Sequence, residues 1–170
     1  MRAEDFYKYL YSIFENVTPL KTDCGTLCGG ACCSESDAGS GMYLYPMEHR
    51  IYTPRPDWVK IYKTDFEYGD NHPVYMLSCP DRCDREIRPL ACRIFPLVPY
   101  VKRGEKLQII IDPRSRGLCP LYESGVDGEF ISAVARAAKI LYAEPECREY
   151  LYAQSQLIDD YIKFYKPEGL

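Results

Sequence analysis

Apolar residues follow a helical spacing at the start of the chain. Five of them recur at intervals that place them on one helix face: Phe6, Leu10, Ile13, Phe14 and Val17. Pro19 follows and breaks the pattern. This spacing predicts an amphipathic helix from about Ala3 to Asn16.

The last forty residues show the same periodicity twice. Asp127 is placed to cap a helix whose predicted apolar face is made of Phe130, Ile131, Val134, Ala138 and Leu141. Pro145 stands at a first-turn position of a second helix. The predicted apolar face of this second helix consists of Leu151, Ile158, Tyr161, Ile162 and Tyr165.

The middle of the chain alternates apolar and polar residues over short runs. "MYLYP", "WVKIYKTDF" and "PVYMLSCP" are strand candidates, and "MEHRIY" predicts one or two helical turns. "LVPYVK" and "LQIIIDP" predict two strands joined by a turn that contains Gly104. We therefore expect an α+β fold in which a small, irregular, cysteine-rich core with short strands is packed by N-terminal and C-terminal helices.

The length of the chain fits one domain. Its 170 residues allow a hydrophobic core that needs no cross-links. We predict a single domain over residues 1–170, with a cysteine-cluster region at about 20–122 and a C-terminal helical region at about 127–166.

The charge and hydropathy of the chain limit the classes of partner that we expect it to bind. The formal net charge is −4, from 25 acidic and 21 basic residues, and no basic run points to a nucleic-acid backbone. No apolar run approaches the ~20 residues that span a bilayer, and the N-terminus lacks the apolar stretch of a signal peptide. We expect a soluble cytoplasmic protein that binds neither nucleic acid nor membrane.

Cysteine is the residue type that carries candidate chemistry. Eight of the nine cysteines lie in the middle of the chain: Cys24, Cys28, Cys32, Cys33, Cys79, Cys83, Cys92 and Cys119. In a reducing cytosol, clustered thiols are more often metal ligands than disulfides. Thiolates favour zinc and iron-sulfur clusters, so the eight predict one or two such sites. Cys147 is isolated, and we interpret it as a small buried apolar residue.

The first cysteine group is rich in glycine. Gly25, Gly29 and Gly30 can take positive φ and let the chain fold back, so we expect a loop over this segment rather than a helix. Adjacent Cys32 and Cys33 point apart in an extended chain. They therefore serve either two neighbouring sites or one site and a structural role.

Other cysteine signatures do not fit. The radical-SAM spacing C-x3-C-x2-C has one residue fewer than this chain, and a thioredoxin-like C-x2-C is missing. His49 and His72 lie too far apart for a Cys2His2 zinc finger, and neither has ligand spacing to a cysteine.

Three stretches together resemble a known family. "CGTLCGGACC", "MYLYPMEHRIY" and "CDREIRPLACRIFPL" are similar to the YkgJ-type cysteine-cluster proteins of bacteria and archaea, described as zinc- or iron-chelating domains. The opening cysteines and the late Cys119 match that pattern, as does the acidic Glu48. The second motif is matched by Arg88, Pro89, Cys92, Arg93, Phe95 and Pro96. The resemblance covers about Cys24 to Cys119 and implies metal ions as the partner.

Polar residues beside the cysteines have two interpretations each. Arg88 and Arg93 form surface salt bridges, or they offset the −2 charge of a zinc tetrathiolate. Glu48 is an oxygen donor near the metal, or, as we favour, a carboxylate at a helix start.

We expect a metal-binding protein whose cysteine thiolates chelate zinc or an iron-sulfur cluster. Its biological use stays open between structural or metal-handling zinc binding, iron-sulfur redox or electron transfer, and an enzyme related to the flagellin lysine N-methylases. No S-adenosylmethionine site, paired carboxylate or phosphate loop is recognisable, so the enzyme ranks last.

Overall fold

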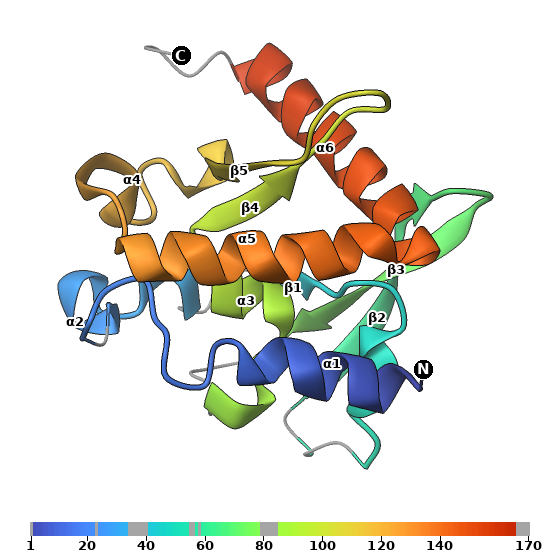
Figure 1. Cartoon of the computed structure of the whole chain (residues 1–170), viewed down its shortest axis with the longest axis horizontal. Helices are drawn as coiled ribbons and strands as arrows, with labels where there is room; N and C mark the ends of the chain where they lie inside the picture. The colour runs from blue at the N-terminus through green and yellow to red at the C-terminus, as the bar shows by residue number, and fades with distance from the viewer. Residues whose placement is uncertain are drawn as a thin grey trace.

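Two small antiparallel sheets in the middle of the chain and helices toward both ends form an α+β fold, as the sequence predicts (Figure 1). The computed structural model describes residues 2–22, 24–33, 41–54, 57, 59–78 and 85–165, with Cys33 and Arg85 described by their backbone alone. Cys79 and Cys83 therefore lie outside the described residues.

The first sheet has three strands in the order β1-β3-β2. It consists of β1 (Met42–Tyr43), β2 (Lys60–Tyr68) and β3 (His72–Ser78), all paired antiparallel. Gly69 and Asn71, at φ of 55° and 63°, reverse the chain between β2 and β3. The strands fall on the three predicted runs, although β1 is only two residues long.

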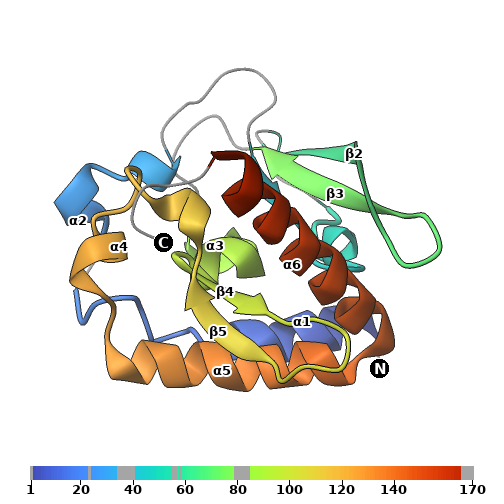
Figure 2. The ribbon, with the colours of Figure 1, turned by 90° about the horizontal axis from the view of Figure 1, so that it is seen from above.

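The second sheet is the predicted pair around Gly104. Strand β4 (Leu97–Tyr100) pairs antiparallel with β5 (Gln108–Ile111), and Leu97 stands opposite Ile111. Gly104 takes a φ of 82° in the connection, a conformation that a residue with a Cβ rarely adopts. This pair lies between the two long C-terminal helices (Figure 2).

Helix α1 spans Ala3–Ser12 and ends four residues before the predicted boundary at Asn16. The amides of Ile13 and Phe14 donate to carbonyls three residues back, so the chain tightens into a short turn. This turn delivers Phe14 to the core, where its ring lies 6.3 Å from that of Phe130. Apolar spacing alone did not separate the helix from the turn that follows it.

Helix α5 spans Gly128–Ala143 and has the predicted cap. The Asp127 carboxylate accepts a hydrogen bond from the Glu129 amide at 2.8 Å. One predicted core residue is wrong, because Ile131 is 44% exposed. The buried face consists of Phe130, Ala133, Val134, Ala137, Ala138 and Leu141. Small alanines let this face pack closely and turn Ile131 outward.

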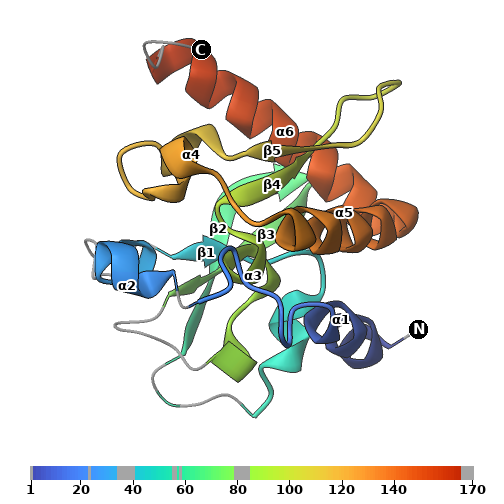
Figure 3. The same cartoon turned by 60° about the vertical axis from the view of Figure 1, so that its left-hand side comes forward.

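Helix α6 spans Pro145–Tyr165 and begins at the predicted proline. Leu151 and Ile158 are buried as predicted, but Tyr165 is 72% exposed. The last turns of α6 extend beyond the rest of the protein, which explains the exposure (Figure 3). Over the described ranges, no helix combines the length and apolarity needed to cross a bilayer.

Short helical elements connect these parts. The α-helical turns are α2 (Gly25–Cys28), α3 (Leu90–Ile94) and α4 (Leu121–Ser124). The 3-10 turns are η1 (Ala31–Cys33), η2 (Glu48–Ile51), η3 (Arg85–Ile87) and η4 (Pro113–Ser115). The turn η2 lies in the "MEHRIY" segment predicted to be helical.

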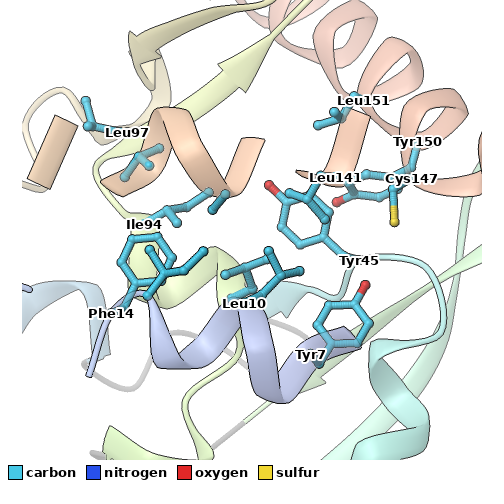
Figure 4. Close-up of a cluster of buried hydrophobic side chains, with 14 of the residues drawn as sticks. Tyr7, Leu10, Phe14, Tyr45, Ile94, Leu97, Leu141, Cys147, Tyr150 and Leu151 are labelled. Carbon is cyan, nitrogen blue, oxygen red and sulfur yellow. The ribbon is translucent and has the colours of Figure 1, made fainter. Parts of the chain in front are cut away.

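The core joins both ends of the chain. Side chains of α1, α5 and α6 pack together around Tyr45, with Leu10, Leu141 and Leu151 fully or almost fully buried (Figure 4). Cys147 is 0% exposed in the same cluster, which confirms its interpretation as a buried apolar residue. The helices from the two ends therefore share one core.

Burial makes Cys147 unreactive in the folded protein. Burial raises the pKa of its thiol to about 12, so almost no thiolate forms at pH 8. We expect iodoacetamide at pH 8 to leave Cys147 unmodified in the native protein and to alkylate it fully after unfolding. Peptide mass spectrometry of the two samples checks this, and modification of native Cys147 within minutes would contradict it.

Candidate metal centre

The first cysteine segment contains a helical turn, so the predicted loop is wrong. Helix α2 covers Gly25–Cys28, and the chain reverses at Gly29 and Gly30, whose φ values are 65° and 77°. The amide of Gly30 donates to the carbonyl of Gly25 at 3.1 Å and closes the turn. Gly29 and Gly30 take positive φ as predicted, whereas Gly25 is helical. Cys24 and Cys28 are thus one helical turn apart.

Cys92 lies on α3, whose start is set by Pro89. Pro89 is the N-cap residue at φ −63°, and the five-residue helix ends at Phe95. Cys119 follows η4 and is held by its amide, which donates to the Ser115 carbonyl at 2.8 Å. Helices α2 and α4, which flank these cysteine segments, lie at the same end of the molecule in all three views (Figures 1–3).

One cavity of about 530 Å³ collects the described cysteines of the predicted cluster. It is lined by Cys24, Cys28, Cys32, Cys92 and Cys119, which come from three separate parts of the chain. We refer to it as the cysteine cavity. Burial raises the pKa of Cys119; a backbone hydrogen bond from Leu121 lowers it, and the proximity of Cys28 raises it.

The sulfur atoms share this cavity without forming a closed ligand set. Within the described part of the chain, no three His, Cys, Asp or Glu side chains are close enough together to hold a metal ion. Three of the eight predicted metal ligands cannot be placed in this cavity. The structure describes only the backbone of Cys33, and Cys79 and Cys83 lie within residues 79–84, outside the described residues.

The two histidines lie elsewhere and stack on tyrosines. The His49 ring lies 4.2 Å from that of Tyr75, and the His72 ring lies 5.4 Å from that of Tyr68. Neither lines the cysteine cavity. Burial lowers the pKa of His49.

Glu48 is fully buried and does not line the cysteine cavity. Its carboxylate binds two backbone amides and a tyrosine hydroxyl. Its Oε1 accepts hydrogen bonds from the Leu90 amide at 2.7 Å and the Tyr11 hydroxyl at 2.6 Å, and its Oε2 accepts one from the Tyr45 amide at 2.9 Å. Burial raises its pKa, while these bonds and the Arg93 charge favour the ionised form. Glu48 is thus the helix-start carboxylate that we favour, and it also fixes the first amide of the helix that carries Cys92.

Arg93 borders the cysteine cavity and braces the chain before α3. Its Nε donates to the Arg88 carbonyl at 2.7 Å and its Nη2 to the Glu86 carbonyl at 2.8 Å. The guanidinium also lies over the Tyr11 ring, 4.1 Å from its centroid. These contacts fix a positive charge at the wall of the cysteine cavity, which Arg88 also lines.

Tyr11 is the functional-site residue that sequence reasoning missed. It contacts both Glu48 and Arg93, although it lies in the first helix and outside the cysteine motifs. Its spacing in "FYKYLYSIF" does not distinguish it from the other tyrosines of that helix.

Comparison with known proteins gives no match. No protein-family model, curated protein or solved structure matches this chain. Similarity to YkgJ-type proteins therefore depends on the motif residues alone.

Proposed function

We propose that this protein binds metal through its cysteine thiolates, as one or two zinc ions or as an iron-sulfur cluster. The observation that carries the proposal is that five cysteines from three separate segments line a single cavity. Thiolate sulfur is a soft ligand, and both metals accept it. Cysteines scattered by chance over 170 residues have no reason to meet in this way.

The ligands would come from the same five residues and their neighbours in sequence. Cys24, Cys28 and Cys32 supply three thiolates from one short segment, and Cys92 and Cys119 supply two more. Cys33, Cys79 and Cys83 complete the proposed set. A bound metal would join these segments and thereby contribute to folding, as thiolate-bound zinc does in small domains.

Positive charge beside the thiols supports an anionic centre. Four thiolates around zinc carry a net charge of −2, which is costly to bury without compensation. Arg88 and Arg93 line the cavity, and Arg93 is held in place by two carbonyls and an aromatic ring. We propose that the two guanidiniums offset the charge of the thiolate centre.

The motif resemblance supports the same proposal. We infer membership of the YkgJ-type family from the cysteine, Arg-Pro and Phe-Pro motifs, and the protein would then be a zinc- or iron-chelating domain. A redox role follows if the centre is an iron-sulfur cluster. An enzymatic role like that of the flagellin lysine N-methylases is the weakest of the three, because the sequence contains no recognisable S-adenosylmethionine site.

Metal analysis of the full-length protein tests the proposal. The protein is purified without oxygen, its absorption near ~400 nm is recorded, and zinc, iron and labile sulfide are measured per chain. A colourless protein with stoichiometric zinc establishes the zinc site and excludes the cluster. A brown protein with iron and sulfide does the reverse. A protein that holds neither and does not take up added zinc overturns the proposal.

A further inference from the structure

A second cavity, of about 210 Å³, lies against a different face of α3. Ala91 and Ile94 line this cavity, whereas Cys92 and Arg93 line the cysteine cavity. We refer to it as the glutamine cavity, because Gln154 of α6 is one of its walls. It contains no cysteine, so metal binding does not account for it.

Polar atoms without partners face this region. The Gln154 carboxamide oxygen and the Tyr45 hydroxyl line or border the cavity from side chains that are only 5% and 1% exposed, and neither atom has a hydrogen-bond partner among the described residues. The hydroxyl of Tyr150 also has no hydrogen-bond partner among the described residues; its ring lies 5.0 Å from that of Tyr45, but Tyr150 does not line the cavity. Each such buried group costs about 1–3 kcal/mol if it stays unpaired.

The two hydroxyl groups have a common direction. Figure 4 shows the oxygens of Tyr45 and Tyr150 pointing to the side on which Ile94 and Leu97 lie, and both of these apolar residues line the glutamine cavity. Burial raises the pKa of both tyrosines, so the hydroxyls are neutral and can donate or accept.

The charges at this cavity already balance. The Asp112 carboxylate accepts from the Arg114 guanidinium at 2.8 Å through Nε and at 2.6 Å through Nη2, and both residues line the cavity. A charged ligand would leave one charge uncompensated in a largely buried place, which is unfavourable. The occupant that fits is therefore uncharged.

We propose that the glutamine cavity binds a small uncharged molecule that carries an N–H or O–H donor and a short apolar part. The donor pairs with the Gln154 oxygen, the Tyr45 hydroxyl completes its hydrogen bonds, and the apolar part contacts Ile94 and Leu97. With a volume of about 210 Å³, the cavity has room for a small molecule of this kind. The proposal does not depend on metal binding.

Titration with propionamide tests the proposal on the full-length protein. Propionamide has both the donor and the apolar part; propionate has the same skeleton with a charge, and 2-butanone has no donor. We expect saturable NMR shifts at residues lining the glutamine cavity with propionamide, and at least about tenfold weaker binding of the other two probes. Absence of a saturable shift, or equal binding of propionate, would overturn the proposal.

Variants separate ligand binding from a structural role. Gln154→Met keeps the length of the side chain without its oxygen and is expected to weaken propionamide binding about tenfold or more. Gln156→Met, on the exposed side of the same helix, is the matched control and should bind normally. Tyr45→Phe should also weaken binding, without lowering the melting temperature, because it removes an unpaired hydroxyl. Unchanged binding in Gln154→Met and Tyr45→Phe, or a cavity that holds only ordered water, would refute the proposal.

Discussion

Replacing Cys92 by serine is expected to remove most of the bound metal and to destabilise the protein. Cys92 lies on helix α3 and lines the cysteine cavity. Its replacement therefore removes the proposed ligand that α3 contributes. Loss of a direct ligand should exceed the ~10- to 100-fold drop in affinity seen when an outer hydrogen-bond partner of a ligand is removed. Cys28→Ser should behave alike. Metal per chain and thermal unfolding of the variants measure both effects.

Cys147→Ser is the matched control for these variants. It changes the same atom in a cysteine that lies in the apolar core, away from the cysteine cavity. We expect full metal content but a loss of about 1–3 kcal/mol in the free energy of unfolding, because a hydroxyl replaces a buried thiol. The isolation of Cys147 in the sequence predicts no effect on stability, whereas the full burial of its side chain makes a loss the expected result. Normal metal content in Cys92→Ser and Cys28→Ser would contradict the ligand assignment.

Glu48→Ala is expected to lower the free energy of unfolding by about 3–5 kcal/mol. The substitution leaves the amides of Leu90 and Tyr45 and the hydroxyl of Tyr11 without their acceptor in a fully buried place. Because the Leu90 amide begins α3, we also expect a weaker metal site through displacement of Cys92. Chemical denaturation and metal titration of the same samples check the two effects.

Two milder substitutions separate the contributions of the individual Glu48 hydrogen bonds to the free energy of unfolding. Glu48→Gln keeps one acceptor oxygen but turns an N–H₂ group toward a donor, and should cost about 1–3 kcal/mol. Tyr11→Phe removes one donor and leaves the backbone bonds intact, and should cost about 1 kcal/mol. A Glu48→Ala variant as stable as Tyr11→Phe would show that the buried carboxylate does not hold α3.

Local signals in the sequence predicted the elements well. Asp127 and Pro145 marked the starts of the two C-terminal helices because capping depends on residues within one turn. The pair β4–β5 was predictable because two apolar runs flank a polar connection, residues 101–107, that contains the glycine that positive φ requires. The α+β class followed from these periodicities.

Contacts between distant segments were not predictable in this way. Glu48 binds Tyr11 and Leu90, which are 37 and 42 positions away, and no spacing in the sequence joins the three. Ile131 and Tyr165 have the right period for a core face, but neighbouring elements decide which part of that face is covered. In α2, one helical turn forms despite its glycines, since Gly29 and Gly30 are needed only where the turn ends.

Tyr11 connects helix α1 to Glu48 and Arg93, the two residues that hold α3 in place. Its hydroxyl donates to Glu48 and its ring lies under Arg93, so residues near the start of the chain help to shape a cavity whose cysteines lie between positions 24 and 119. A recombinant version shortened to begin after Phe14 would keep every candidate ligand and still lose this support. Expression trials of the cysteine region alone should therefore retain the first fourteen residues, and a tag is better attached beyond Tyr165, where the last helix extends away from the core (Figure 3).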